Sequence, residues 1–301
     1  MQLEQAPVLV SRQKLSLERL RFRGRRVASK ILVYVLLAIL ALLAILPFLW
    51  MASTSLKTVQ EASTYPPPIL PAVPQWHDFA DVYNSVPMLT FFRNTVFYSV
   101  MVTIGQLVFC STAAFAFARL RFPGREVLFL IYLATLMIPT AMTLVPSFIL
   151  MKWFHWLDTI WVMTIPGMFG SAFGTFLLRQ FMLGIPRDLD EAATIDGAGL
   201  FRIYWQIVLP LTGSALTVLA VLTTMTVWND FAWPLVMLNS SSVMTLTLGL
   251  AVFATGGTQE FTNVPLLMAA ATMTIAPLIL IFFFAQRYFV RGIALSGFGG
   301  R

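Results

Sequence analysis

Six long apolar stretches without a single charged residue constrain this chain more than any other feature. They cover roughly residues 31–51, 95–117, 127–150, 159–178, 207–228 and 264–285. A helix needs about 20 apolar residues to cross a hydrocarbon core of about 30 Å, and one charge at its centre costs about 2.5 to 3.5 kcal/mol on insertion scales. We therefore predict an all-α membrane protein with six transmembrane helices.

The composition fits a lipid environment. The chain is 58% hydrophobic and 11% charged, whereas soluble domains carry about 25% charged residues. Its net charge of +7 does not indicate a nucleic-acid partner, because the basic residues lie between apolar stretches and not on one polar face. No lysine follows a glycine as a phosphate-binding G-x-x-x-x-G-K-[ST] loop requires. We expect no catalytic site, metal or cofactor in this chain.

The positive residues indicate the orientation. Seventeen of the 20 Lys and Arg residues lie in the N-terminal arm 1–30, in the loops after the second and fourth stretches, and at the C-terminal end. The other three are Lys57, Arg93 and Lys152. Because Lys and Arg are retained on the cytoplasmic side, we expect both termini to be cytoplasmic. The basic arm can also serve simply as an anchor to the lipid surface.

The segments outside the membrane are small. After a first transmembrane helix at 31–51, the outer loop 52–94 is rich in proline and too short to form a receptor domain, so another protein is expected to capture the substrate. A further apolar piece at 244–254 is too short to cross, and we interpret it as a re-entrant or surface segment.

The loop 183–211 after the fourth stretch is predicted to form a helix, a turn and a second helix. Pro186 precedes Asp188 and Asp190, either of which can cap a short helix, and Asp196-Gly197 is a turn signal. An amphipathic stretch follows, with apolar residues at helical spacing. These are Phe201, Tyr204, Trp205 and Val208. An ordinary surface helix between two spans would have the same pattern.

Three pieces of this loop resemble the EAA loop of the permease subunits of ABC importers. They are Glu191-Ala192-Ala193, Asp196-Gly197-Ala198 and Pro210-Leu211. That family uses the loop as a coupling helix, which docks on a separate ATPase that binds ATP and Mg²⁺. The resemblance implies that the residues at the ATPase contact are Glu191, Ala192, Ala193, Asp196, Gly197, Ala198, Gly199 and Pro210. Tyr204 stands where the family commonly has phenylalanine.

Further segments resemble the carbohydrate-uptake branch of these importers, and most of all its smaller, maltose-type permease. They are residues 118–125, 138–139, 228–234 and 286–292. The resemblance implies a type I ABC importer permease fold, with a five-helix core at 89–287 and a cytoplasmic tail at 288–301. It also implies a bacterial or archaeal cell membrane, a second permease, two ATPase subunits, an extracytoplasmic solute-binding protein and a sugar substrate. The tail lacks the lysine often present before the last glycine, so its contact with the ATPase stays open.

Four residues could line a sugar pathway, because flat aromatic rings suit the C–H faces of sugars and amide or carboxylate groups suit their hydroxyls. They are Trp228, Asn229, Asp230 and Trp233. An interfacial aromatic belt is the alternative. Gly170 and Gly174 permit close helix packing, against a partner permease or within the chain. Cys110 is expected to be a small buried residue, and His77 and His155 to be interfacial.

Three alternative functions make different demands on the sequence. An importer of the same architecture could carry a non-sugar solute such as glycerol phosphate. An ion-driven secondary transporter should have ionisable residues inside its spans, and a membrane-embedded hydrolase should have a cluster of catalytic groups at one depth. The six stretches contain no Asp, Glu, Lys, Arg or His, which disfavours the last two.

Overall fold

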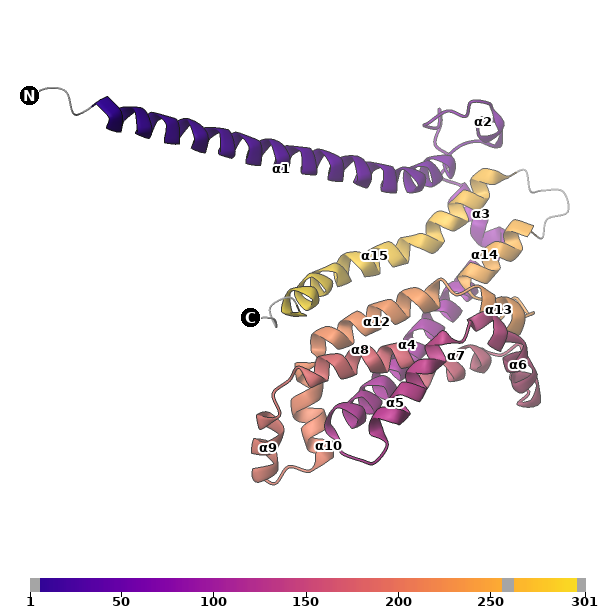
Figure 1. Cartoon of the computed structure of the whole chain (residues 1–301). Coiled ribbons are helices and arrows are strands. Elements are labelled where there is room, and N and C mark those ends of the chain that lie inside the picture. The colour runs from indigo at the N-terminus through magenta and orange to yellow at the C-terminus, as the bar shows by residue number, and fades with distance from the viewer. Residues whose placement is uncertain (1–5, 256–262, 297–301) are drawn as a thin grey trace, which may run out of the picture.

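The computed structural model describes the backbone of residues 6–255 and 263–296, and the side chains of residues 30–255 and 263–283. Every regular element in this part is a helix (Figure 1), which confirms the all-α prediction. The end of the predicted tail, 297–301, lies outside the described residues.

The described part of the chain contains seventeen helical elements in sequence order. Their bounds are α1 (Ala6–Thr54), α2 (Val59–Ser63), α3 (Asp78–Ser85), α4 (Met88–Arg119), α5 (Arg125–Ala134), η1 (Thr135–Met137), α6 (Thr140–Trp153), α7 (Ile160–Met168), α8 (Ala172–Leu183), α9 (Asp188–Ile195), α10 (Leu200–Ile203), η2 (Tyr204–Val208), α11 (Leu209–Leu211), α12 (Gly213–Trp228), α13 (Ala232–Met237), α14 (Leu246–Thr255) and α15 (Val264–Ser296).

Four of the six predicted spans are helical segments long and apolar enough to cross a membrane. They are Lys30–Thr54, Met88–Arg119, Ile160–Leu183 and Val264–Phe283. The other two are bent pairs, so the chain has six candidate spans when each pair is counted as one.

The two bent spans break at different kinds of residue. The pair Arg125–Met137 and Thr140–Trp153 meets at 98°, at an extended Ile138 followed by Pro139, which has no N–H to donate. The pair Leu200–Leu211 and Gly213–Trp228 meets at 76°. There the Thr212 hydroxyl donates to the Leu209 carbonyl at 2.8 Å.

The long helix α4 is central, and it packs against α7, α8 and α12. Small residues allow this close approach. A Cβ built on Gly105 of α4 would lie 2.6 Å from the Cβ of Met168, and one on Gly174 of α8 would lie 2.8 Å from the sulfur of Cys110. The small face that includes Gly174 therefore packs within this chain, and Cys110 is fully buried as predicted.

The short apolar helix α14 does not cross; it rests on α4. The Asn94 side chain donates to the carbonyls of Ser242 and Met244 at 2.9 and 3.0 Å, and the Leu246 N–H donates to the hydroxyl of Thr95 at 2.8 Å. These bonds satisfy backbone groups of the segment that leads into α14. Polar groups inside a membrane protein need such partners, because lipid offers none.

The first helix, α1, extends away from the other helices (Figure 1). It begins at Ala6 and includes much of the predicted arm as well as the predicted first span. The side chains from Ile31 to Trp50 are mainly apolar. Within the segment Lys30–Thr54, the most apolar part of the helix has no residue buried against the rest of the chain. A helix that is apolar all round needs an apolar surrounding, and here that surrounding is lipid or another subunit.

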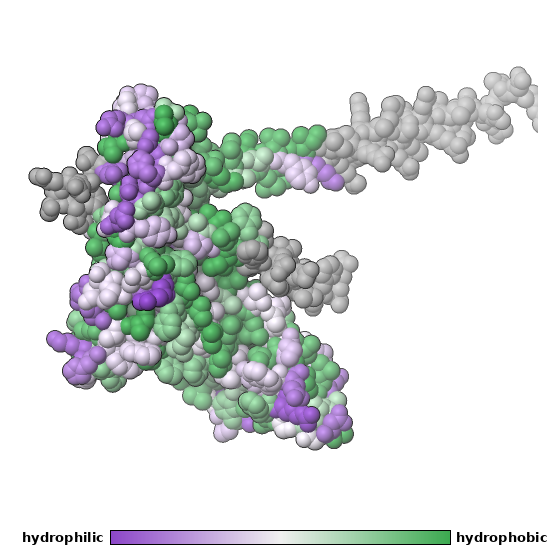
Figure 2. Space-filling model, turned by 180° about the vertical axis from the view of Figure 1, so that it is seen from behind, coloured by the Kyte–Doolittle hydropathy of each residue, from purple (hydrophilic) through white to green (hydrophobic). Residues whose placement is uncertain are grey.

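Hydrophilic residues gather at two ends of the molecule, with hydrophobic residues between them (Figure 2). One end carries α9, α10 and the loop 120–124, and we name it the α9 end. The other carries α2, α3 and the loops 154–159 and 238–245, and we name it the α3 end. This distribution is the one expected of a chain that passes through a membrane between two aqueous sides.

Candidate functional site

Helix α9 forms from residues 188–195 and ends as the sequence predicts. Gly197 has a φ of +81°, its N–H donates to the Thr194 carbonyl at 3.0 Å, and the Ala198 N–H donates to the Ala193 carbonyl at 2.9 Å. This pair of bonds is the Schellman motif, for which glycine is the favoured residue.

The start of α9 differs from the prediction. Arg187 occupies the N-cap position and makes no side-chain capping bond, while Asp188 and Asp190 lie inside the first turn. They act there through charge, because acidic groups stabilise the positive end of the helix dipole. Asp190 also has a second partner on another helix.

One side of α9 is fixed to the end of α4. The Nε of Arg119 lies 3.2 Å from Oδ2 of Asp190, with side-chain exposures of 5% and 19%, and Nη2 of Arg119 donates to the Ile185 carbonyl at 3.0 Å. Ala193 is buried in the cluster that includes Ala118 of α4. An almost buried arginine that binds both a carboxylate and a carbonyl holds α9 in one position.

The other side of α9 is open. Glu191, Ala192, Asp196 and Gly197 are exposed, and so are Gly199 and Pro210, whereas Ala198 is half-buried. Ala193 is the exception among the residues predicted at the ATPase contact, because it packs against its own chain with 9% exposure. Its small size serves the close packing of α9 on α4, and Ala192 alone presents a small side chain outward.

The second half of the loop is helical, but its apolar residues divide between two sides. Tyr204 and Val208 are buried, whereas Phe201 and Trp205 are 77% and 59% exposed. The predicted single apolar face is therefore wrong. The reason is the π-helical segment η2, in which the Leu209 N–H donates to the Tyr204 carbonyl five residues back. This wider turn no longer aligns residues three apart.

Sequence reasoning also missed two exposed apolar residues around α9. Ile195 is 87% exposed and Leu200 is 60% exposed, and with Phe201 and Trp205 they form an apolar rim at the α9 end. The signal for it was present, since Ile195 and Leu200 flank the polar turn at Asp196-Gly197. Exposed apolar side chains of this size beside polar ones are typical of a surface that meets another protein.

The loop is joined to two membrane helices. The hydroxyls of Tyr204 and Ser111 share a hydrogen bond of 2.7 Å, and the Tyr204 ring lies 5.3 Å from that of Phe115, so η2 is attached to α4. At its other end the loop runs through Thr212 directly into α12. The loop that contains α9 is therefore connected to both α4 and α12.

The four residues predicted along a sugar pathway do not share one environment. Trp228 is 3% exposed, and its indole N–H donates to the Thr274 carbonyl at 3.3 Å. The indole N–H of Trp233 donates to the Val162 carbonyl at 3.0 Å. Trp228 thus has no free face for a sugar in this conformation, which corrects its predicted role. Asn229 is exposed, and half-buried Asp230 accepts a 3.1 Å hydrogen bond from Tyr98.

A carboxylate clamp joins two loops at the α3 end. Oδ1 of Asp158 accepts the N–H groups of Asn239 and Ser240, both at 2.8 Å, and Oδ2 accepts the Ser240 hydroxyl. Burial by itself raises the pKa of Asp158, but the Ser240 and Asn239 hydrogen bonds outweigh it and hold that pKa below its usual value. Asp158 also has a φ of +57°, which the sequence did not indicate.

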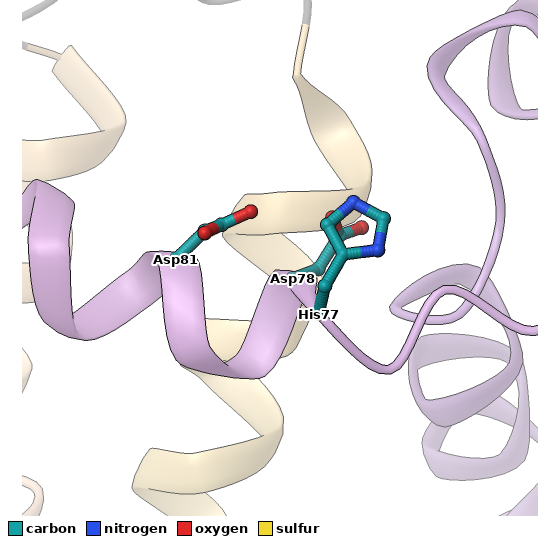
Figure 3. A group of neighbouring side chains, drawn as sticks. All are labelled: His77, Asp78 and Asp81. Carbon is teal, nitrogen blue, oxygen red and sulfur yellow. The ribbon is translucent and has the colours of Figure 1, made fainter.

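A second polar group lies at the start of α3 (Figure 3). The ligand atoms of His77, Asp78 and Asp81 all lie within 4.8 Å of one another, and Nε2 of His77 is 3.2 Å from Oδ1 of Asp78. Burial raises the pKa of Asp78. The charge of His77 acts to lower that pKa, and the charge of Asp81 acts to raise it further. His77 therefore has acidic partners that its predicted interfacial role did not include. Since all three come from one helical turn, they cover only one side of any ion.

Comparison with known proteins identifies relatives that cover most of the chain. A family model described as the binding-protein-dependent transport system inner membrane component matches residues 106–295. The arabinooligosaccharides transport system permease protein AraQ of Halalkalibacterium halodurans is 37% identical over 211 residues, which are 70% of this chain and 74% of that protein. The sn-glycerol-3-phosphate transport system permease protein UgpE of Yersinia enterocolitica is 31% identical over 275 residues, which are 88% and 96% of the two chains.

A solved structure shares the fold. In the crystal structure of a bacterial ABC transporter involved in the import of the acidic polysaccharide alginate, one chain matches with a TM-score of 0.78 and 26% identity, over 86% of this chain and 95% of that one. The predicted resemblance to importer permeases and the predicted permease fold are both confirmed.

Proposed function

Because the chain belongs to the family of binding-protein-dependent transport system inner membrane components, we propose that it forms half of the pathway of an ATP-driven importer and is coupled to a separate ATPase through α9. The observation that carries this proposal is the arrangement of α9, which is fixed to α4 by the Arg119–Asp190 pair and open on its other side.

The arrangement of α9 suits an element that transmits movement from a partner protein to the membrane helices. The outward residues Glu191, Ala192 and Asp196 and the apolar rim offer a partner both polar and apolar contacts. The ion pair of Asp190 with Arg119 and the hydrogen bond of Tyr204 with Ser111 transmit movement to α4, and the chain continues through Thr212 into α12. Coupling of this kind requires a rigid element between the partner and a membrane part with two arrangements. A closing pair of ATPase subunits would supply the movement.

The proposed assembly contains a second permease, two ATPase subunits that bind ATP and Mg²⁺, and an extracytoplasmic solute-binding protein. The chain lies in the cell membrane of a bacterium or archaeon, with the α9 end in the cytoplasm. The distribution of Lys and Arg supports this orientation. Structural similarity to alginate importers supports the solute-binding partner. A bacterial alginate ABC transporter with this fold has been crystallised in complex with a periplasmic protein that holds an alginate pentasaccharide.

The proposed substrate is a carbohydrate, most simply an oligosaccharide. It is supported by similarity to the arabinooligosaccharide permease and to the alginate importer. Glycerol phosphate is the second candidate, because its permease matches a larger share of this chain. Thermal unfolding of the cognate solute-binding protein with each ligand separates the two. Stabilisation by glycerol phosphate and by no sugar would refute the carbohydrate assignment.

The coupling role is tested with charge-matched variants of α9. Glu191→Gln should abolish transport and transport-linked ATP hydrolysis, while insertion stays normal, because the exposed carboxylate serves the partner. Asp188→Asn removes the same charge from the same exposed helix, outside the proposed contact, and should transport normally. Normal transport by the Glu191→Gln variant would show that α9 is not the coupling element.

A second pair of variants separates backbone strain from coupling. Gly197 and Gly124 have φ values of +81° and +79°, with open space around both, so alanine costs each about 1 to 2 kcal/mol of strain. We expect Gly197→Ala to uncouple hydrolysis from transport and Gly124→Ala to leave the two coupled. Equal behaviour of the two variants in a reconstituted transport assay would contradict the proposal.

A further inference from the structure

A basic hollow of about 840 Å³ lies at the α9 end, between the loop that joins α4 to α5 and the start of α9. Its charged lining residues are Arg121, Arg125, Glu126 and Arg187. Arg121 and Arg187 are exposed and Arg125 is half-buried. The hollow therefore brings together cations from two loops that lie far apart in the sequence.

The single carboxylate of this hollow is shared between two arginines. Glu126 lies 2.8 Å from Nη2 of Arg125 and 2.9 Å from Nη2 of Arg179. The guanidinium of Arg187 donates to the Ala118 carbonyl at 3.4 Å, which does not neutralise it. The lining therefore holds three guanidinium groups and one carboxylate, so the hollow has a positive charge that favours an anionic ligand. Phosphate suits arginine in particular, because both offer bidentate geometry.

An exposed apolar surface begins at the edge of this hollow. Helix α5 starts at Arg125, and its next turns expose Val127, Leu130 and Ile131 by 61%, 64% and 61%. A ligand that fills the hollow and also covers this surface must carry an anionic head and apolar tails. Basic pockets between transmembrane helices are known to bind the head groups of anionic lipids.

We propose that the hollow binds the phosphate group of an anionic phospholipid, whose acyl chains lie along the exposed face of α5. Arg121 contributes from the α4–α5 loop, and Arg187 contributes from the residue that precedes α9. A bound lipid therefore connects the α5 side of the molecule with the start of α9. This binding goes beyond the proposed coupling, and it requires neither nucleotide nor transported solute.

The test uses the full-length chain, purified in mild detergent and stripped of lipid. Phosphatidylglycerol, phosphatidylcholine with the same acyl chains, and inorganic phosphate are added separately, and bound lipid is counted by native mass spectrometry alongside thermal unfolding. We expect phosphatidylglycerol to bind and to raise the unfolding temperature, with phosphatidylcholine and inorganic phosphate giving neither effect. The double variant R121Q/R187Q should bind phosphatidylglycerol about 30-fold less tightly, since each of the two lost charges near a lipid surface contributes about 1 kcal/mol.

Two controls keep the outcome decisive. Arg202→Gln removes an exposed charge of the same loop region, outside the hollow, and should bind phosphatidylglycerol as the unchanged chain does. R121K/R187K keeps the charge and should restore most of the binding lost in the glutamine variant. Equal binding by R121Q/R187Q and Arg202→Gln would overturn the proposal. Equal binding of phosphatidylcholine would also overturn it, and displacement of the lipid by inorganic phosphate would identify a site for soluble anions instead.

Discussion

Replacement of Gly105 by alanine tests the close packing of α4 against α7. A Cβ at this position would lie 2.6 Å from the Cβ of Met168 and 2.7 Å from its Cα, whereas ordinary contacts are 3.4 to 4 Å. Both obstructing atoms belong to or adjoin the backbone, so a side-chain rotation cannot make room. The two helices must separate locally by roughly 1 Å.

The expected loss of stability follows from three effects of the substitution. Overpacking of a well-packed core costs about 1 to 3 kcal/mol. The neighbouring Gln106 side chain donates to the Gly167 carbonyl at 2.6 Å, and the loss of that bond costs about 1 kcal/mol. Alanine regains about 0.5 to 1 kcal/mol of helix stability over glycine. We expect Gly105→Ala to lower the free energy of unfolding by about 1 to 3.5 kcal/mol, which is the net of these values.

The assay is unfolding in mixed micelles with a rising fraction of a denaturing detergent, followed by circular dichroism. Gly213→Ala is the matched control, because no atom lies within 4 Å of a Cβ built at the first residue of α12. It should be neutral or should stabilise by up to about 1 kcal/mol. If Gly105→Ala unfolds at the same detergent fraction as Gly213→Ala, or at a higher one, the packing of α4 against α7 is not as close as described.

Two further predictions concern charged groups outside the spans. Asp190→Asn should lower the local stability of α9 by about 2 kcal/mol, somewhat less than the cost of breaking a fully buried pair, because it leaves the 5% exposed Arg119 without its carboxylate. Faster amide exchange in α9 measures this, and Asp188→Asn should leave that exchange unchanged. The Asp158 clamp should be complete above the ordinary aspartate pKa of about 3.9 and should open as the pH falls through the lower pKa of the folded state. Amide exchange at Ser240 follows the opening, and a pH-independent rate there would contradict it.

Prolines illustrate what the sequence could not decide. Pro146 and Pro166 lie inside helices that continue past them, whereas Pro139 lies at the 98° break. Each proline removes a donor from the helical ladder, and the sequence marks all of them equally. Whether the chain bends there depends on which neighbouring helices pack against it and which polar groups satisfy the freed carbonyls.

The candidate site was predictable in part. Gly197 was identified as the end of α9 because its role is local, set by backbone conformation within a few residues. The burial of Ala193 and the pairing of Asp190 with Arg119 were not identified, because they depend on where the end of α4 lies. Trp228 was assigned to a pathway on chemistry alone, and its burial depends on helices contributed by distant parts of the chain.

The sequence alone indicated that this chain resides in a membrane, and where its apolar spans and the loop that contains α9 lie. Insertion into hydrocarbon requires continuous apolar segments, and a helix cap requires particular residues close together, so both leave local patterns in the sequence. The tertiary structure decided which spans bend, which side of α9 stays open, and which arginines meet around the basic hollow. Those features arise when segments distant in the sequence come into contact, because packing and charge pairing act through space and leave no fixed spacing along the chain.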